Sequence, residues 1–233
     1  MIRFNGVDLT DIAPVKIDDI AVSPISLSPV ARQRAIDFGA DFVRMGGGSR
    51  TVTVTFALLE IDSAEREAAL QAIRDWAVIS GEKTLELPHF ENRHLECVCT
   101  THPETSYRKW WENKLRVVFT CFSNPYWTSN ELIEVPCGQT FSIGGSAPPL
   151  VTIERSGVTS LSNQTYASRT ESMTFSTIPA GTFRIDLNKQ TAQIGNTSVM
   201  RYYVPTSTWI VPKVGAYQII TGAGVVRYRE RWV

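Results

Sequence analysis

Hydrophobic and polar positions alternate along most of the chain, and this two-residue period predicts β-strands. The clearest case is residues 50–56 (RTVTVTF), where Val52, Val54 and Phe56 fall on one face and threonines on the other. Further strands are predicted for TLELPHF, HLECVCT and KLRVVFTCF in the same half. Residues 2–9 (IRFNGVDL) carry an Asn-Gly pair between apolar residues, which predicts a tight hairpin.

One segment, from about residue 62 to 80, has a helical period instead. Asp62 stands where an N-cap would accept hydrogen bonds from free amide groups. Leu70, Ile73 and Ala77 form one apolar stripe, and Gly81 is a natural stop. We therefore predict a single amphipathic helix over this segment.

Residues 20–50 combine apolar side chains with Pro24, Pro29 and the Gly46–Gly48 run. Proline and glycine interrupt regular pairing, so this stretch predicts an extended arm with a glycine hinge rather than a central strand. Because exposing so many apolar side chains to solvent is unfavourable, we expect part of the arm to pack against a neighbouring subunit.

After residue 129 only the two-residue period remains, in short runs separated by turn residues. The runs are ELIEV, TFSI, LVTIER, SMTFST, GTFRIDL, TAQIG, MRYYV, STWIV, AYQII and VVRYRERWV. This spacing is typical of an antiparallel β-sandwich. The whole pattern predicts a mainly β (β-rich α+β) protein.

The charge balance changes at the same point, which favours two domains, residues 1–129 and 130–233. Lys and Arg number 14 against 17 Asp and Glu in the first part, a net −3, and 9 against 6 in the second, a net +3. Between them lies TCFSNPYWTS. We interpret Asn124, Pro125, Tyr126 and Trp127 as the domain junction, with Asn-Pro turning the chain and the aromatics packing the joint.

The overall composition is that of a globular protein, with 43% hydrophobic and 20% charged residues. A net charge of zero argues against a dedicated nucleic-acid binder, which usually has a basic surface. The N-terminus lacks the pattern of a secretory signal, and no apolar run approaches the roughly 18 residues that span a bilayer. We expect a protein that is made in a cytosol and makes no membrane contact.

The four cysteines are expected to be free thiols, because they are too few for a disulfide framework in 233 residues. A zinc site is the alternative for the cluster of His89, His94, Cys97, Cys99 and His102. Zinc sites usually space their cysteines as Cys-x₂₋₄-Cys, whereas Cys97 and Cys99 alternate within one strand. We therefore favour a core face with histidines in flanking turns, and predict no metal.

No catalytic or cofactor-binding residues stand out. Gly46–Gly48 is followed by a predicted strand, not by the Lys-Ser/Thr and helix of a phosphate-binding loop. No nucleophile elbow occurs, and the second half has no histidine to act as a base. Tyr202, Tyr203 and Trp209 (with Trp232) could stack on sugar rings, although we favour aromatics that pack a sandwich core. We expect neither an enzyme nor a bound cofactor.

The order of these segments resembles the distal tail protein family of long-tailed phages. The resemblance covers nearly the whole chain: an arm, RTVTVTF, a helix ending in glycine, a strand with arginine ahead of it (RHLECVCT) and KLRVVFTCFSNPYW. The second half adds GTFRIDLNKQTAQIGN and ends on VVRYRERWV. The match lies in the order of short motifs rather than in one signature.

The resemblance implies an N-terminal split β-barrel with one helix and a C-terminal galectin-like sandwich. It also implies a ring, six copies in that family, that joins the tail tube protein to a tail-associated hub or fibre protein at the virion tail tip. DNA would pass through the lumen only as cargo, and the −3 charge of the first half would favour passage. Galectins hold galactose with His-x-Asn-Pro-Arg and Trp-x-x-Glu, and residues 130–233 contain neither.

The sequence thus favours a structural phage or prophage tail-tip protein that forms a ring adaptor. The alternative is a carbohydrate-binding module that recognises the host cell surface.

Overall fold

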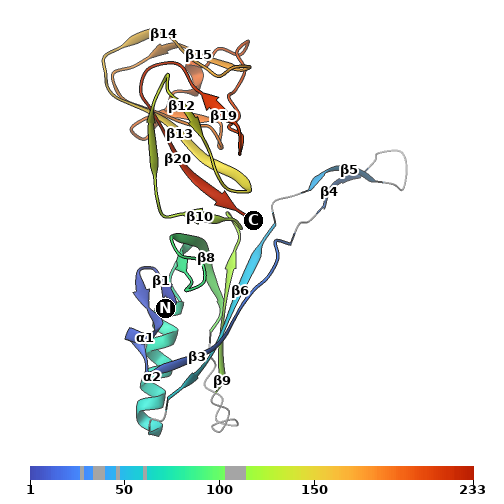
Figure 1. Ribbon diagram of the computed structural model, residues 1–233, viewed down its shortest axis with the longest axis vertical. Helices are drawn as coiled ribbons and strands as arrows, with labels where there is room; N and C mark the ends of the chain where they lie inside the picture. Colours follow the sequence, from blue (N-terminus) through green and yellow to red (C-terminus); the bar gives the residue numbers. More distant parts are fainter. Residues whose placement is uncertain (27–28, 34–39, 46–47, 60–61, 103–113) are drawn as a thin grey trace. The chain divides into compact units, whose positions relative to one another are not determined.

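The computed structural model describes residues 1–26, 29–33, 40–45, 48–59, 62–102 and 114–233 (Figure 1). These residues divide into two compact units, unit 1 from Met1 to Trp127 and unit 2 from Thr128 to Val233. Antiparallel strands predominate in both units, so the predicted mainly β fold class is confirmed. The residues 27–28, 34–39, 46–47, 60–61 and 103–113, which include part of the expected glycine hinge, lie outside the described part.

Unit 1 is built on one antiparallel sheet in the order β2–β1–β7–β8–β9–β6–β3. Its elements are β1 (Arg3–Phe4), β2 (Val7–Asp8), α1 (Leu9–Ile12), β3 (Val15–Val22), β4 (Pro29–Gln33), β5 (Ala40–Met45), β6 (Arg50–Leu58), α2 (Ser63–Ala77), β7 (Lys83–Glu86), β8 (Arg93–Thr101) and β9 (Lys114–Cys121). The short β10 (Trp127–Ser129) lies at the division between the units.

The sequence pattern accounts for these elements. In β6, Val52, Val54 and Phe56 are buried and the threonines between them are half-buried, as the alternation predicted. The predicted hairpin is present as β1–β2, and its turn residues Asn5 and Gly6 have φ of 51° and 80°. Two consecutive residues with positive φ match the right-handed twist of the paired strands, which explains the Asn-Gly pair.

Helix α2 begins where the capping pattern placed it. The Asp62 carboxylate accepts hydrogen bonds from the amides of Ala64 and Glu65, both at 2.9 Å. The helix ends at Ala77 rather than near residue 80, because Val78 leaves the helical region with φ −90° and ψ 81°. The expectation of a single helix was also incomplete, since the four-residue helix α1 follows β2.

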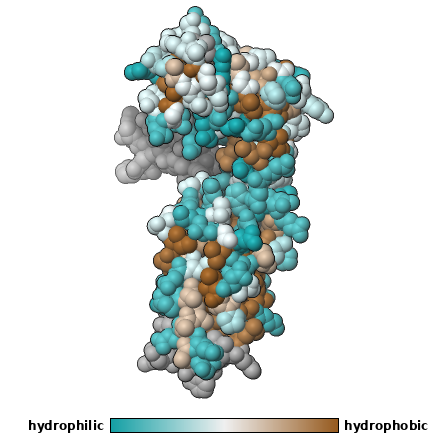
Figure 2. Space-filling view, turned by 90° about the vertical axis from the view of Figure 1, so that its left-hand side faces the viewer, coloured by the Kyte–Doolittle hydropathy of each residue, from teal (hydrophilic) through white to brown (hydrophobic). Residues whose placement is uncertain are grey.

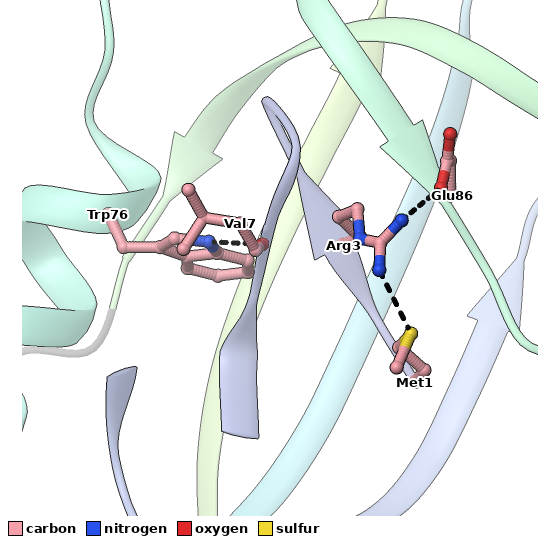
Figure 3. A network of polar contacts seen from close by, with 5 residues as sticks. All are labelled: Met1, Arg3, Val7, Trp76 and Glu86. Atoms are coloured by element: carbon pink, nitrogen blue, oxygen red, sulfur yellow. Dashed lines mark hydrogen bonds and ion pairs between the residues drawn. The ribbon is translucent and has the colours of Figure 1, made fainter. Parts of the chain in front are cut away.

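An aromatic cluster joins α2 to the sheet. The ring of Phe4 packs edge-on against Trp76, with centroids 5.8 Å apart, and Phe119 contacts both rings. The Trp76 indole also donates a hydrogen bond of 3.0 Å to the carbonyl of Val7, which Figure 3 shows beside the β1–β2 hairpin. One side chain of α2 therefore anchors both the core and the N-terminal hairpin.

The arm predicted over residues 20–50 contains two paired strands, β4 and β5, which form a hairpin of their own. Ahead of it β3 pairs with β6, and the bridge between Ser26 and Ser49 continues that pairing toward the hairpin. Gly48 lies so close to Ser26 that an added Cβ would meet its carbonyl oxygen at 2.0 Å. The last glycine of the predicted hinge is therefore required by a close backbone contact.

Unit 2 is an antiparallel sandwich. One sheet has the order β18–β17–β16–β13–β20–β11, and the hairpin β14–β15 and the pair β12–β19 lie apart from it in separate sheets. The strands are β11 (Ile133–Pro136), β12 (Thr140–Ser142), β13 (Ala147–Val158), β14 (Leu161–Ala167), β15 (Ser172–Ile178), β16 (Gly181–Asp186), β17 (Thr191–Ile194), β18 (Thr197–Ser198), β19 (Tyr217–Ile219) and β20 (Val225–Trp232). Ring contacts of Phe183 with Phe175 (5.2 Å) and Tyr166 (6.2 Å) join the layers.

Two strand predictions in unit 2 were wrong, and one strand was missed. MRYYV forms the 3-10 turn η2 (Met200–Tyr202), and STWIV has no strand structure. The reason is proline: Pro205 and Pro212 enclose the second run, and proline cannot donate to a sheet. Strand β14 was missed because its sequence, LSNQTYA, is mostly polar, although Tyr166 within it is buried.

Candidate functional site

Strand β3 is an edge strand of the unit 1 sheet, with eight residues. Among the described strands it pairs only with β6, so its other side has no partner in the described part of the chain. Lys16, Asp18, Asp19 and Ala21 are exposed on it, and its register shifts between Ile17 and Asp19. Charges and a bulge at an edge prevent indiscriminate pairing but leave it available to a specific partner.

The opposite end of the sheet is the β1–β2 hairpin, whose polar contacts appear in Figure 3. The Arg3 guanidinium lies 3.6 Å from the Glu86 carboxylate and donates to the Met1 sulfur at 3.4 Å. Both members of this ion pair are partly exposed, so it contributes little to stability. It can, however, orient the N-terminus at this edge.

Apolar side chains also reach the surface of unit 1. Met1, Val7, Leu59 and Val78 are between 41% and 68% exposed. Figure 2 shows several apolar patches separated by hydrophilic side chains on the face in view. Scattered apolar residues are ordinary on a monomer, so this surface alone identifies no partner.

The predicted junction residues lie at the end of unit 1. Trp127 is 3% exposed and stacks on Phe90 with centroids 4.0 Å apart, and the Arg50 guanidinium lies 6.0 Å from its ring. The side-chain oxygen of Asn124 accepts a hydrogen bond from the amide of Tyr126, across Pro125. This is a local turn, and it fixes the approach of Trp127 to its stacking partner.

Glu82 holds the chain just before this turn. Its carboxylate accepts hydrogen bonds from the amides of Phe122 (3.1 Å) and Ser123 (2.9 Å). Burial acts to raise the pKa of Glu82, but the hydrogen bonds from Ser123 and Phe122 outweigh it, so the pKa is lowered. No local pattern predicts this contact, because its partners lie 40 and 41 positions apart along the chain.

The cysteine-rich strand β8 turns Leu95 and Cys97 into the core, and Cys99 is half-buried. Cys97 lies beside Cys121 of β9, and its hydrogen bond to that thiol, together with burial, raises its pKa. All four cysteines are free thiols. His94 lies within β8 rather than in a flanking turn.

Within the described residues no three His, Cys, Asp or Glu side chains gather in a way that could hold a metal ion. In the same residues no helix is both long and apolar enough to cross a membrane.

The aromatics proposed for sugar stacking are engaged in packing and hydrogen bonds. Tyr203 contacts the rings of Phe175 and Trp209, and its hydroxyl donates to the carbonyl of Ser207 at 2.7 Å. The Trp209 indole donates to the carbonyl of Leu187 at 3.0 Å. The Tyr202 ring lies under the Arg201 guanidinium, 4.7 Å away. Their half-buried rings contribute to the sandwich, and sugar binding by them stays a prediction.

No protein-family model and no curated protein matches the sequence. Among solved structures, the chain is similar to the SPP1 Dit protein, described as a paradigm of the hub adsorption apparatus in phages that infect Gram-positive bacteria. That match has a TM-score of 0.75 at 13% identity and covers 100% of this chain and 98% of the other.

Two further similar structures are of the phage P2 baseplate in its activated conformation, each at 10% identity. The calcium form has a TM-score of 0.44 and covers 97% of this chain and 93% of the other; the strontium form has 0.43, 97% and 92%. The SPP1 match confirms, at the level of the fold, the resemblance to a distal tail protein that the order of sequence motifs suggested.

Proposed function

We propose that the chain is a structural subunit of a phage tail tip, where copies of unit 1 form a closed ring. The observation that carries the proposal is the fold match to SPP1 Dit over the full length of both chains. The ring would have six copies, as the resemblance implies. It would join the tail tube protein to a tail-associated hub or fibre protein in the virion.

Closing a ring requires two different complementary surfaces on each copy, because head-to-tail contacts must repeat around an axis. The unpaired side of β3 is one such surface, since a strand edge binds another strand through its backbone. The β4–β5 hairpin supplies a second, and we propose that it packs on the neighbouring copy. Strands β4 and β5 pair with each other, so the hairpin leaves the unpaired side of β3 uncovered and one copy can offer both surfaces at once.

The proposed lumen would face DNA in transit. Unit 1 carries 14 basic and 17 acidic residues, a net charge of −3, and DNA carries a negative charge about every 1.7 Å of its axis. An acidic lining would neutralise few DNA phosphates and so would release few of the counterions condensed on the DNA. Without that release the lining would not retain the duplex.

Native mass spectrometry and electron microscopy of the purified chain test the ring. Six copies of the 26.0 kDa chain amount to about 156 kDa, and that species should dominate at high micromolar concentration. Ala21→Glu places a charge at the exposed edge of β3 and should shift the mass toward the monomer.

The matched control is Ala180→Glu, at an exposed turn of unit 2, which should leave the mass unchanged. A wild-type protein that stays monomeric would contradict the ring, and equal effects of both substitutions would contradict the role of β3.

Carbohydrate recognition at a host surface is the second candidate function. One observation favours it: unit 2 exposes an aromatic side chain, Tyr217, at a pocket that apolar, polar and charged side chains line together.

A further inference from the structure

The pocket of unit 2 lies between two segments that are distant in sequence. It has a volume of about 220 Å³. One wall is the turn between β14 and β15 (residues 168–171), and the other is formed by residues 210, 211, 213 and 216–220, which include β19. Ala167 and Thr221 hold the two walls together, because each donates its amide to the other's carbonyl. Sites for drug-sized ligands measure roughly 300–1,000 Å³, so this pocket suits a single ring-sized group.

Hydrogen bonds within each wall of the pocket order it in the absence of a ligand. On one side, the Ser168 amide donates to the carbonyl of Glu171 at 2.8 Å, and the Ser168 hydroxyl donates to the Glu171 carboxylate at 2.7 Å. On the other, the Gln218 side chain accepts from the amide of Lys213 at 2.9 Å and donates to its carbonyl. A pocket with ordered walls loses little conformational entropy on binding.

The groups at the rim are free to bind. Tyr217 is 74% exposed and, within the described residues, its side chain has no hydrogen bond or ring contact. Arg169 and Lys213 are exposed, and neither side chain has an ion pair in the described part of the chain. The Glu171 carboxylate accepts from Ser168, and among the described residues it forms no ion pair with either cation.

We propose that this pocket binds one sugar residue that carries a carboxylate or phosphate group. The Tyr217 ring stacks on the apolar face of the sugar, as amphipathic aromatic rings do. Arg169 and Lys213 bind the anionic group through charge-assisted hydrogen bonds, and Glu171 accepts from a hydroxyl. The net charge of +3 in unit 2 favours the approach of such a ligand.

This inference rests on the second candidate function and is independent of the ring, because every residue involved belongs to unit 2. It also differs from sugar stacking on Tyr202, Tyr203 and Trp209, which do not line the pocket.

Calorimetric titration of the full chain tests the ligand class. The anionic probes are methyl glucuronide and glucose 1-phosphate, and the comparison probes are neutral methyl glucoside and inorganic phosphate. We expect a Kd of about 1 mM for both anionic sugars and at least about tenfold weaker binding of both comparison probes. Inorganic phosphate that binds as tightly as glucose 1-phosphate, or no binding of either anionic sugar, would overturn the proposal.

Variants then assign the binding to this pocket. Tyr217→Ala should weaken the binding of both anionic sugars at least about tenfold. The double variant R169Q/K213Q should reduce their affinity to that of methyl glucoside. The control R184Q/K189Q removes the same charge from exposed positions outside the pocket and should leave the affinities unchanged. Unchanged affinity in both pocket variants would refute the site. The native mass of each variant, measured in parallel, reports separately on the ring.

Discussion

At the residue scale, the fold shifts the pKa of buried cysteine thiols and of the Glu82 carboxylate. Cys97 and Cys121 are both fully buried and share a hydrogen bond, and this contact with burial raises the pKa of Cys97. The thiolate is the reactive form, so Cys97 should be inert in the folded protein, and Cys121 is shielded from reagents by its full burial. Cys99 and Cys137 are half-buried, and burial raises the pKa of both.

Maleimide labelling followed by intact-mass measurement checks this. At pH 7 the folded protein should take up no label at Cys97 or Cys121, whereas protein unfolded in guanidinium should be labelled at all four cysteines. Rapid labelling of Cys97 in the folded protein would show that the strand pair β8–β9 opens readily.

Glu82 gives unit 1 a pH-dependent contact. Its pKa is lowered by the amides of Ser123 and Phe122, so its contribution is present above the unfolded-state value near pH 4.3 and is lost as the pH falls through the folded-state value. Glu82→Gln should reduce the free energy of unfolding by about 1 kcal/mol at pH 7, since solvent screens a partly exposed carboxylate.

Urea unfolding at pH 7 and pH 3 measures this effect, and the difference between variant and wild type should narrow at pH 3. Glu96→Gln, at an exposed position of β8, is the control and should have little effect at either pH. A constant difference at both pH values would exclude the charged hydrogen bonds as its cause.

At the element scale, helix α2 depends on its first turn and on Trp76. Asp62 accepts from two amides that otherwise lack partners at a helix start. Asp62→Ala should therefore lower the free energy of unfolding by about 1 kcal/mol in urea titration. Glu67→Ala removes an exposed carboxylate from the same helix and should stay within about 0.5 kcal/mol of wild type. Equal losses would mean that net charge, not capping, matters here.

At the scale of the whole molecule, each unit has a core of its own. Unit 2 buries a cluster that includes Phe175, Phe183, Ile185 and Val226. Residues 128–233 expressed alone should therefore show β-type circular dichroism and one cooperative thermal transition. A fragment without cooperative unfolding would show that unit 2 needs unit 1 to fold.

The sequence by itself determined the elements in which local pattern and packing agree. The alternation of β6, the Asn-Gly hairpin and the Asp62 cap each depend on neighbours a few residues away, and those neighbours are visible in one dimension. The fold class followed from their order along the chain.

Only the tertiary structure decided what distant segments do together. Strand β14 is mostly polar, and it forms because its backbone pairs with β15. The run around Trp209 forms no strand because prolines flank it on both sides. Tyr217 and Arg169 are 48 positions apart and line the same pocket, which no sequence motif predicts. Their meeting depends on the backbone pairing of Ala167 with Thr221, a long-range contact that no local pattern encodes.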